Sequence, residues 1–161
     1  MATISTFVQA AGGKGNPGPK AYMVEREVNL VTEAPDPSAA DVLQVLTVPA
    51  DTMILSAGLE VIEVAVQNTG TDATADVGTS TDDDEWVAAF DIDGASVGDY
   101  APVAAAATTQ MDGVANTLDL TFAGTGASFT AGKLRVFALL MDVGSSGSSK
   151  TADEVDRDTL A

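Results

Sequence analysis

The sequence predicts an all-β protein, an antiparallel β-sandwich or jelly roll of about eight short strands. Two patterns lead to this expectation. Short stretches in which apolar and polar residues alternate recur along the chain, and clusters of Gly, Pro, Asn, Asp and Ser separate them. No amphipathic helix of useful length and no long internal repeat is visible, so we expect two stacked sheets rather than a helical or solenoid fold.

Residues 1–20 are expected to form a flexible N-terminal arm. Their second half, Ala11–Lys20, is so rich in Gly and Pro that regular structure is interrupted. This run lacks the Gly-Lys-Ser/Thr ending of a phosphate-binding loop. The first residues carry neither a basic start nor a long apolar stretch, so we expect no secretory signal.

The sandwich is expected to occupy residues 21–143. Its first strand is predicted over Tyr22–Val31, where Arg26 interrupts the apolar face and is expected at a sheet end or paired with an acidic residue. Val42–Val48 follows a proline-rich turn and predicts a second strand. A short segment of three apolar residues, Met53–Leu55, comes next.

Leu59–Gln67 is apolar on both faces and predicts a strand covered on both sides. The turn residues after it predict that Thr74–Thr79 returns as the second strand of a hairpin. The single tryptophan, Trp86, is expected to pack over one end of the sandwich with its indole N–H bonded to a loop carbonyl. The alternative for this side chain is an exposed anchor at an interface.

The last predicted strands are Thr117–Phe122, with polar residues on the side away from the core, and Lys133–Val143. Residues 144–161 begin with a run of Gly and Ser and continue with polar residues, so we expect a flexible C-terminal tail.

Composition excludes several classes of function. The 161 residues include no His and no Cys, so the commonest general base and the usual transition-metal ligands are missing, and we expect no enzyme activity and no organic cofactor. Asp and Glu outnumber Lys and Arg by 24 to 7, and the formal net charge is −17. Such a chain is expected to bind neither nucleic acid nor an anionic membrane.

Clustered acidic residues form the one candidate metal site. Asp82, Asp83 and Asp84 are consecutive, and Asp91 and Asp93 follow closely. Clustered carboxylates on loops suit calcium, which takes six to eight oxygen ligands. The spacing is not that of an EF-hand, however, and the alternative is a pair of solvated acidic turns.

Several motifs are similar to those of a known family. They are Thr47–Leu55, Leu59–Val61, Asp76–Thr79 with the acidic run after it, Trp86-Val87 and Phe90–Asp93. Across residues 42–100 the sequence resembles small virion structural proteins of tailed bacteriophages. In those proteins a strand ends at a Val/Ile-Pro-Ala-x-Thr step, and a second strand and a glycine-containing acidic loop follow.

The resemblance implies a decoration (cement) protein that forms a homotrimer and binds the major capsid protein, with a position in the tail or neck as a further possibility. The charge favours the outer capsid surface, because a protein on the inner side would meet packed DNA and be repelled by it. Lys14 and Lys20 lie on the predicted arm and are expected to contact the capsid or a neighbouring subunit. Two alternatives remain: a calcium-dependent module that recognises host glycans, and a prokaryotic surface or pilus-like subunit, which the lack of a signal segment disfavours.

Overall fold

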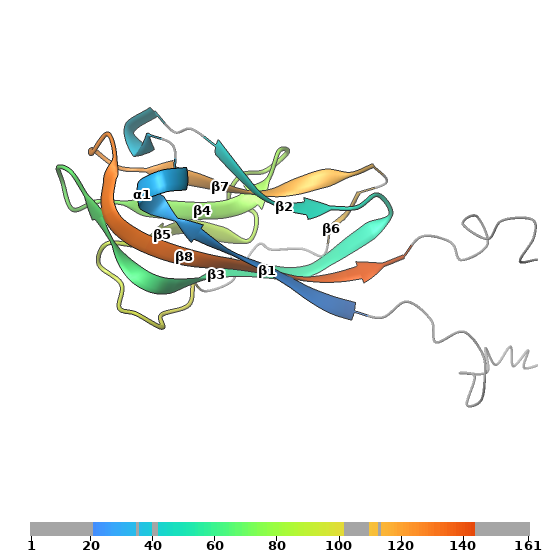
Figure 1. Cartoon of the computed structure of the whole chain (residues 1–161). Helices are drawn as coiled ribbons and strands as arrows, with labels where there is room; N and C mark the ends of the chain where they lie inside the picture. The colour runs from blue at the N-terminus through green and yellow to red at the C-terminus, as the bar shows by residue number, and fades with distance from the viewer. Residues whose placement is uncertain (1–20, 35, 40–41, 102–109, 113, 144–161) are drawn as a thin grey trace, which may run out of the picture.

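The computed structural model describes residues 21–34, 36–39, 42–101, 110–112 and 114–143, and these form two stacked antiparallel sheets (Figure 1). The predicted arm and tail, residues 1–20 and 144–161, lie outside the described residues. The elements in chain order are β1 (Ala21–Asn29), the helix α1 (Leu30–Glu33), the 3-10 helix η1 (Pro37–Ala39), β2 (Val42–Val48), β3 (Thr52–Gln67), β4 (Thr74–Thr79), β5 (Val87–Asp91), β6 (Gln110–Asp112), β7 (Asn116–Ala123) and β8 (Phe129–Asp142).

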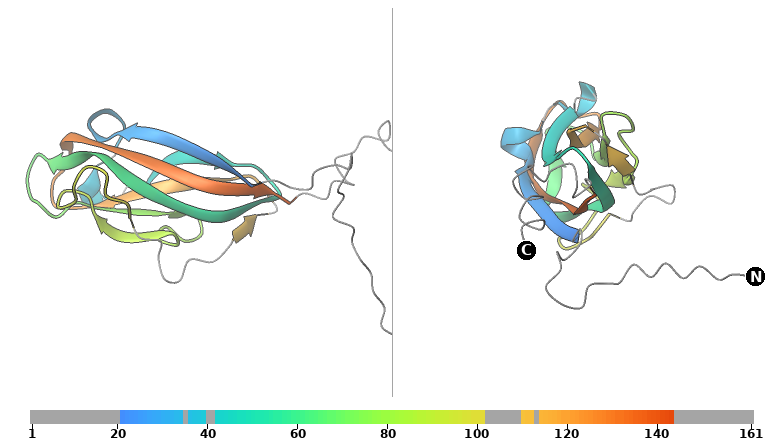
Figure 2. Two further views of the ribbon diagram at one scale, coloured as in Figure 1. Left: turned by 90° about the horizontal axis from the view of Figure 1, so that it is seen from below. Right: turned by 90° about the vertical axis from the view of Figure 1, so that its right-hand side faces the viewer.

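The strand order is that of a jelly roll. One sheet, called sheet A here, has the order β1-β8-β3-β6, and the other, sheet B, has the order β2-β7-β4-β5. Strands therefore pair first with last and inward from there: β1 with β8, β2 with β7, β3 with β6, and β4 with β5. This is the nested pairing of a long β-ribbon wrapped into two sheets, and it confirms the predicted fold class. The views in Figure 2 show the two sheets facing each other.

The core fills the space between the sheets. Apolar residues of the inner strand faces are buried, and the largest that are fully buried are Trp86, Phe122, Leu30, Ile54, Leu59, Ile92, Leu118, Leu120, Leu134 and Leu140. Buried positions follow a period of two along β8 and much of β3, as expected for a strand with one face toward a core. The alternation in the sequence thus correctly predicts which residues of these strands face the core.

The predicted hairpin of Leu59–Gln67 with Thr74–Thr79 is wrong. The first segment belongs to β3 in sheet A, where it pairs with β8, whereas β4 lies in sheet B between β7 and β5. The turn residues mark a chain reversal but not the sheet that the chain joins. At the end of β3 the Asn68 N–H donates to the Ser128 carbonyl at 2.9 Å, which ties this turn to the β7–β8 loop.

Strand β3 also joins two predicted pieces, Met53–Leu55 and Leu59–Gln67, into one strand of 16 residues. Its pairing with β8 shifts register between Ile54 and Ser56 and again toward its end. Such bulges let a long strand bend with the sandwich, and they break the alternation that the sequence would otherwise show.

Strand β1 ends at Asn29, before the predicted end at Val31, because a short helix is capped there. The Asn29 side chain accepts a hydrogen bond from the Val31 N–H, and Glu33 Oε1 accepts one from the Asn29 N–H, both at 3.0 Å. This reciprocal capping satisfies N–H groups that a helix start leaves free. Neither described helix is long and apolar enough to span a membrane.

Arg26 bridges the edge where the two sheets approach at β1 and β2. Its guanidinium forms an ion pair with Glu33, as the prediction of an acidic partner required. It also donates to the carbonyls of Gln44 at 3.5 Å and Val45 at 3.4 Å, both in β2. The charge that interrupts the apolar face of β1 therefore lies at the open side of the sandwich.

Candidate interaction surfaces

The outer face of sheet A is apolar at one end and charged at the other. Strand register places side chains of β1, β8 and β3 in rows across this face. At one end, the outward-facing apolar residues form what we call the apolar band: Met23, Met53, Tyr100, Phe137, Leu139 and Met141. Met23 is 60% exposed and Tyr100 is 60% exposed, so the band presents large apolar side chains to solvent.

The band is held in place by close packing on the sheet. Tyr100 packs edge-on against Phe137, with ring centroids 6.2 Å apart. Gly58 lies opposite Phe137 in the ladder, and a Cβ on Gly58 would come within 2.9 Å of that ring. The missing side chain lets the ring lie flat on the strand.

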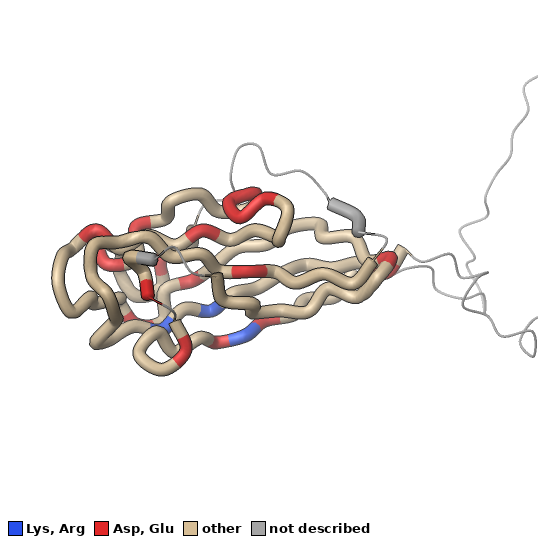
Figure 3. Tube along the Cα trace, turned by 90° about the horizontal axis from the view of Figure 1, so that it is seen from above, with Lys and Arg blue, Asp and Glu red and all other residues tan. Residues whose placement is uncertain are grey.

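The charged half of this face carries ion pairs. Arg135 donates to Glu60 at 2.9 Å, and Lys133 lies 4.0 Å from Glu63. Together with Arg26 these are the basic residues of the described part of the chain, and all of them belong to sheet A. Figure 3 shows them gathered in one region, while acidic residues are spread over the molecule.

Both described ends of the chain lie beside the apolar band. Ala21, the first described residue, pairs with Met141 near the end of β8 (Figure 1). Residues 1–20 therefore join the sandwich next to the band. Lys14 and Lys20 lie outside the described residues, so their contact with a partner stays a prediction.

The structure divides the predicted metal ligands into two groups. Asp82, Asp83 and Asp84 lie in the loop between β4 and β5, and their carboxylate oxygens come within 4.8 Å of one another. Asp91 is at the far end of the hairpin, where it pairs with Thr74 at the start of β4. At about 3.3 Å per residue, the length of β4 puts the groups roughly 15 Å apart.

Asp91 and Asp93 are used locally. Asp91 accepts a hydrogen bond from the Gly94 N–H at 2.7 Å, and Asp93 accepts one from the Ala73 N–H at 3.2 Å. The bond from Gly94 lowers the pKa of Asp91, whereas burial raises the pKa of Asp93. These two carboxylates therefore organise the turns where β4 begins and β5 ends.

The loop of residues 80–85, called the acidic loop here, folds back over the outer face of sheet B. The Thr79 N–H donates to the Asp82 carbonyl at 2.7 Å, and the Trp86 N–H donates to the Val77 carbonyl at 2.9 Å. Gly78 lies beneath, and a Cβ there would come within 2.1 Å of the Asp82 carbonyl oxygen. Only glycine leaves space for this close approach.

Polar residues of the neighbouring strand β7 are also buried. The predicted alternation of β7 is confirmed, with Leu118 and Leu120 in the core. Asp119 and Thr121, on the other side, were expected at a solvent-facing surface, yet only 3% and 6% of their surfaces are exposed. Burial raises the pKa of Asp119, and a hydrogen bond with the Thr117 side chain lowers it. The alternation in the sequence gives no signal for this burial, because it separates the two faces of a strand and does not say what covers the outer face.

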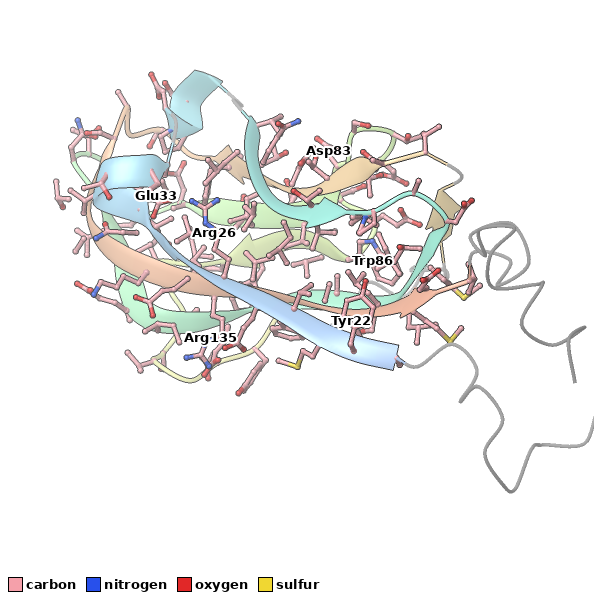
Figure 4. The ribbon with its side chains drawn as sticks, turned by 45° about the vertical axis from the view of Figure 1, so that its right-hand side comes forward. Tyr22, Arg26, Glu33, Asp83, Trp86 and Arg135 are labelled. Carbon is pink, nitrogen blue, oxygen red and sulfur yellow. The ribbon has the colours of Figure 1, made fainter. Side chains whose placement is uncertain are left out.

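Trp86 is 1% exposed, which confirms that it packs within the sandwich and excludes an exposed anchor. The predicted hydrogen bond from its indole to a loop carbonyl is not formed within the described part of the chain, where Nε1 has no hydrogen-bond partner. Figure 4 shows Trp86 between the sheets and Asp83 on the outer side of sheet B.

Comparison with known proteins finds solved structures with a similar fold but no match by sequence. No family model matches the chain, and no curated protein sequence matches it. Among solved structures, a chain of the cyanophage Pam1 capsid asymmetric unit has a TM-score of 0.61 and 19% identity over 87% of this chain and 97% of that one. A chain of the Ralstonia phage GP4 capsid has a TM-score of 0.56 and 21% identity over 79% of this chain and 86% of that one. This chain has the fold of phage capsid chains.

A third chain with the phage capsid fold comes from the acid-stable capsid of Helicobacter pylori bacteriophage KHP30, with a TM-score of 0.50 and 14% identity over 75% of this chain and 86% of that one. The likeness confirms the resemblance to phage virion structural proteins at the level of fold. The Thr47–Leu55 motif that carried the resemblance is the step between the sheets, from β2 into β3. Asp51 takes a φ of 55° there, a left-handed conformation that Asp tolerates.

The apolar band is a feature of this chain that the sequence-based prediction missed. Its residues come from strands far apart in the sequence. A signal was present, because Met23, Leu139 and Met141 are apolar at positions of β1 and β8 that face away from the core. Apolar residues on the polar side of an alternating strand indicate a contact surface.

The raised pKa values predict a pH dependence of stability. Burial raises the pKa of Asp76 and of Asp119 above 3.8, so the folded chain binds protons more readily than the unfolded chain. The free energy of unfolding should therefore rise as pH falls from 7 toward these raised values. Asp72 and Asp91 have lowered pKa values and oppose this only near and below 3.8. We expect the melting temperature, measured at constant ionic strength, to increase as the pH is lowered from 7 into the acidic range above 3.8, and a melting temperature that only falls over this range would contradict the prediction.

Proposed function

We propose that this chain is a non-enzymatic decoration protein that binds the major capsid protein on the outer surface of a phage capsid. The support is a fold shared with phage capsid chains over 79–87% of this chain and 86–97% of those chains. The formal net charge of −17 favours the outer surface, because an inward position would face DNA of the same charge.

The observation that carries this proposal is the apolar band. Monomeric proteins rarely expose contiguous large apolar side chains, and such surfaces mark contacts with other proteins. The band lies on one sheet face and is continuous with the point where residues 1–20 join the sandwich. The band and the N-terminal segment thus offer one combined contact surface for an apolar area of the capsid shell.

Binding to a capsid does not require a high affinity of each subunit. We propose a homotrimer, in which three copies of the same surface engage a symmetric shell at once. Linked contacts raise the effective concentration of each further contact, so that modest individual affinities give tight attachment.

The substitution Met23→Glu tests the band. Met23 is 60% exposed, so the charged side chain is accommodated in the free protein, but it must be desolvated against an apolar partner. We expect affinity for phage capsids lacking this chain to fall about tenfold or more, which corresponds to about 1.4 kcal/mol. Co-sedimentation with such capsids measures it.

Val31→Glu is the matched control, since Val31 is also an exposed apolar residue, 52% exposed, but lies beyond the opposite end of β1. It should bind as the wild type does. Equal losses of capsid affinity in both variants would show that the added charge, and not its position in the apolar band, weakens binding. A wild-type chain that does not bind such capsids would refute the decoration role.

Deletion of residues 1–20 tests the predicted contact of Lys14 and Lys20. These twenty residues include two basic and no acidic side chains, in contrast to the rest of the chain. We expect the shortened chain to keep its melting temperature and to bind capsids more weakly, with a reduced dependence on salt. Unchanged capsid binding would show that the N-terminal segment does not contribute to the contact with the capsid.

A further inference from the structure

We propose that the free edge of strand β1 binds a segment of residues 1–20 from a second copy of this chain, which adds a strand to sheet A. The contact uses the edge of the sheet, whereas the capsid contact is placed on its outer face. It gives the homotrimer proposed above a physical linkage, and to that extent it rests on the proposed function.

Strand β1 is the edge strand of sheet A, and among the described strands it pairs with β8 alone (Figure 2). This pairing continues from Ala21 to Asn29 without a register shift. In an antiparallel ladder, alternate residues direct their N–H and C=O groups toward the partner strand, and the residues between them direct these groups away. The Asn29 N–H donates to Glu33 Oε1 at 3.0 Å and thus points away from β8. The odd-numbered residues of β1 therefore direct their backbone groups to the free edge.

Strand β3, on the other side of β8, gives the same alternation. The Val61 N–H donates to the Asp99 carbonyl at 2.9 Å, and the Val61 carbonyl accepts from the Gly98 N–H at 2.8 Å, so Val61 faces away from β8. Its ladder partner Leu134 therefore directs its backbone groups to Val28 of β1. Even-numbered residues of β1 thus bond to β8.

The odd-numbered residues are left with backbone groups to pair. Within the described part of the chain, no hydrogen bond from another segment reaches the N–H or C=O of Met23, Glu25 or Glu27. An exposed row of unpaired N–H and C=O groups is a template for a further strand. The free edge of β1 is therefore a docking surface for an extended segment.

The other described sheet edges are protected. In sheet A, β6 pairs with the first residues of β3, and residues 98–101 and Ile92 bond to the stretch that follows. In sheet B, Arg26 donates to two carbonyls of β2, and β5 has five residues with Ala89 at a φ of 48°. Short or irregular strands and covering loops are the usual protection of edges. In the described part of the chain, β1 is the long, regular edge that lacks it.

The edge is acidic, which selects its partner. Glu25 and Glu27 are exposed, and the basic residues of the described ranges, Arg26, Lys133 and Arg135, form their ion pairs with other acidic residues. If the whole of β1 paired with β1 of a second copy, Glu25 would lie opposite Glu25, and like charges directly opposed are destabilising. The edge therefore favours a segment with basic and without acidic residues.

Residues 1–20 are such a segment. They carry Lys14 and Lys20 and no acidic residue, whereas residues 144–161 carry four acidic and two basic residues and would be repelled. Thr3–Val8 consists of Thr, Ile, Ser, Phe and Val, and all of these except Ser are enriched in strands. This stretch can supply N–H and C=O groups to β1 and apolar side chains beside Met23.

The position of the segment favours a second copy over its own β1. A return onto its own β1 would require a chain reversal just before Ala21, where Pro17 and Pro19 restrict the backbone. The twelve residues between Val8 and Ala21 span up to about 40 Å when extended, which is enough to reach a neighbouring sandwich. Exchange of this kind is head-to-tail, and it closes into a ring when three copies are related by a threefold axis.

Amide hydrogen exchange in the full chain and in a chain lacking residues 1–20 tests the edge. The N–H groups of Met23, Glu25 and Glu27 should exchange at least about tenfold more slowly in the assembled full chain, whereas those of Val24 and Arg26 should be slow in both chains. Native mass spectrometry should show an assembly of the full chain and single copies of the shortened chain. The melting temperature should be unchanged, because the added strand lies outside the core and dissociates before the sandwich melts.

Glu25→Pro, with Glu25→Gln as its matched control, separates the backbone contact from the charge. Both variants remove the carboxylate, but Pro also removes the N–H that faces the free edge, a position where a strand tolerates proline. We expect Glu25→Pro to raise the Kd between copies about tenfold relative to Glu25→Gln. In the chain lacking residues 1–20, both variants should melt at similar temperatures, which separates lost pairing from misfolding.

Equal exchange of the Met23, Glu25 and Glu27 amides in the full and shortened chains would overturn the proposal. So would slow exchange of these amides in a single copy, because the segment would then pair with its own chain. Equal Kd values of Glu25→Pro and Glu25→Gln would also contradict it, and the exchange comparison needs no substitution if Pro disturbs folding. None of these measurements uses capsids. A chain that assembles through β1 without binding capsids would refute the decoration role alone, and the reverse result would refute this inference alone.

Discussion

Replacing Phe122 with alanine should destabilise the protein by about 3–5 kcal/mol, the usual cost of removing a fully buried phenylalanine. Phe122 is 0% exposed and lies on the inner face of β7, a central strand of sheet B. Its ring packs edge-on against Phe129 of β8, with centroids 5.6 Å apart, so it joins the two sheets. Thermal or denaturant unfolding of Phe122→Ala measures the loss, and we expect a melting temperature roughly 10 °C lower.

Tyr100→Ala is the matched control, because Tyr100 and Phe137 form an edge-on pair of similar geometry at the surface. Tyr100 is 60% exposed, so its removal leaves no cavity, and the cost should not exceed about 1 kcal/mol. Similar losses in the two variants would contradict the assignment of the core to the space between the sheets.

Gly78→Ala should cost about 3 kcal/mol, at the upper end of the range for overpacking a filled site. The new Cβ would meet the Asp82 carbonyl oxygen at 2.1 Å and the Asp83 Cα at 2.6 Å. These are backbone atoms, so no side-chain rotation relieves the clash, and the acidic loop must move off sheet B. Denaturant unfolding measures the cost, and exchange of the loop amide protons should report the displacement.

Gly98→Ala separates this clash from a general effect of replacing glycine. Gly98 has a φ of 89°, which disfavours alanine, but nothing lies within 4 Å of a Cβ there. The cost should therefore be about 1 kcal/mol from the backbone alone. If Gly78→Ala were the milder change of the two, the acidic loop would not lie against β4 as described.

Alternation in the sequence was sufficient to predict which residues face the core. It assigned Leu118 and Leu120 to the interior and placed Thr74–Thr79 in a strand, as observed. It did not assign partners, because a period of two defines the faces of a strand and says nothing of its neighbours. The strand after Gln67 was therefore placed in a hairpin although it crosses to the other sheet.

The candidate sites were predictable only where their residues are adjacent in sequence. Asp82, Asp83 and Asp84 lie close together because they share one loop. Asp91 lies far from them, because β5 separates it from that loop. Asp119 has the pattern of an ordinary solvent-facing acid, yet it is 3% exposed in the folded chain. Contacts of this kind depend on tertiary packing, which local patterns do not encode.

The nested strand pairing has a consequence for how the protein is made. Among the described strands, β1 pairs with β8 alone, and this pairing runs from Ala21 with Met141 to Asn29 with Lys133. A ribosome releases residues in order, so the first strand must wait, without this partner, until residues 133–141 have emerged. Contacts between such distant segments slow folding. We expect maturation to be post-translational and cooperative, with nascent chains that stop before β8 remaining sensitive to proteases.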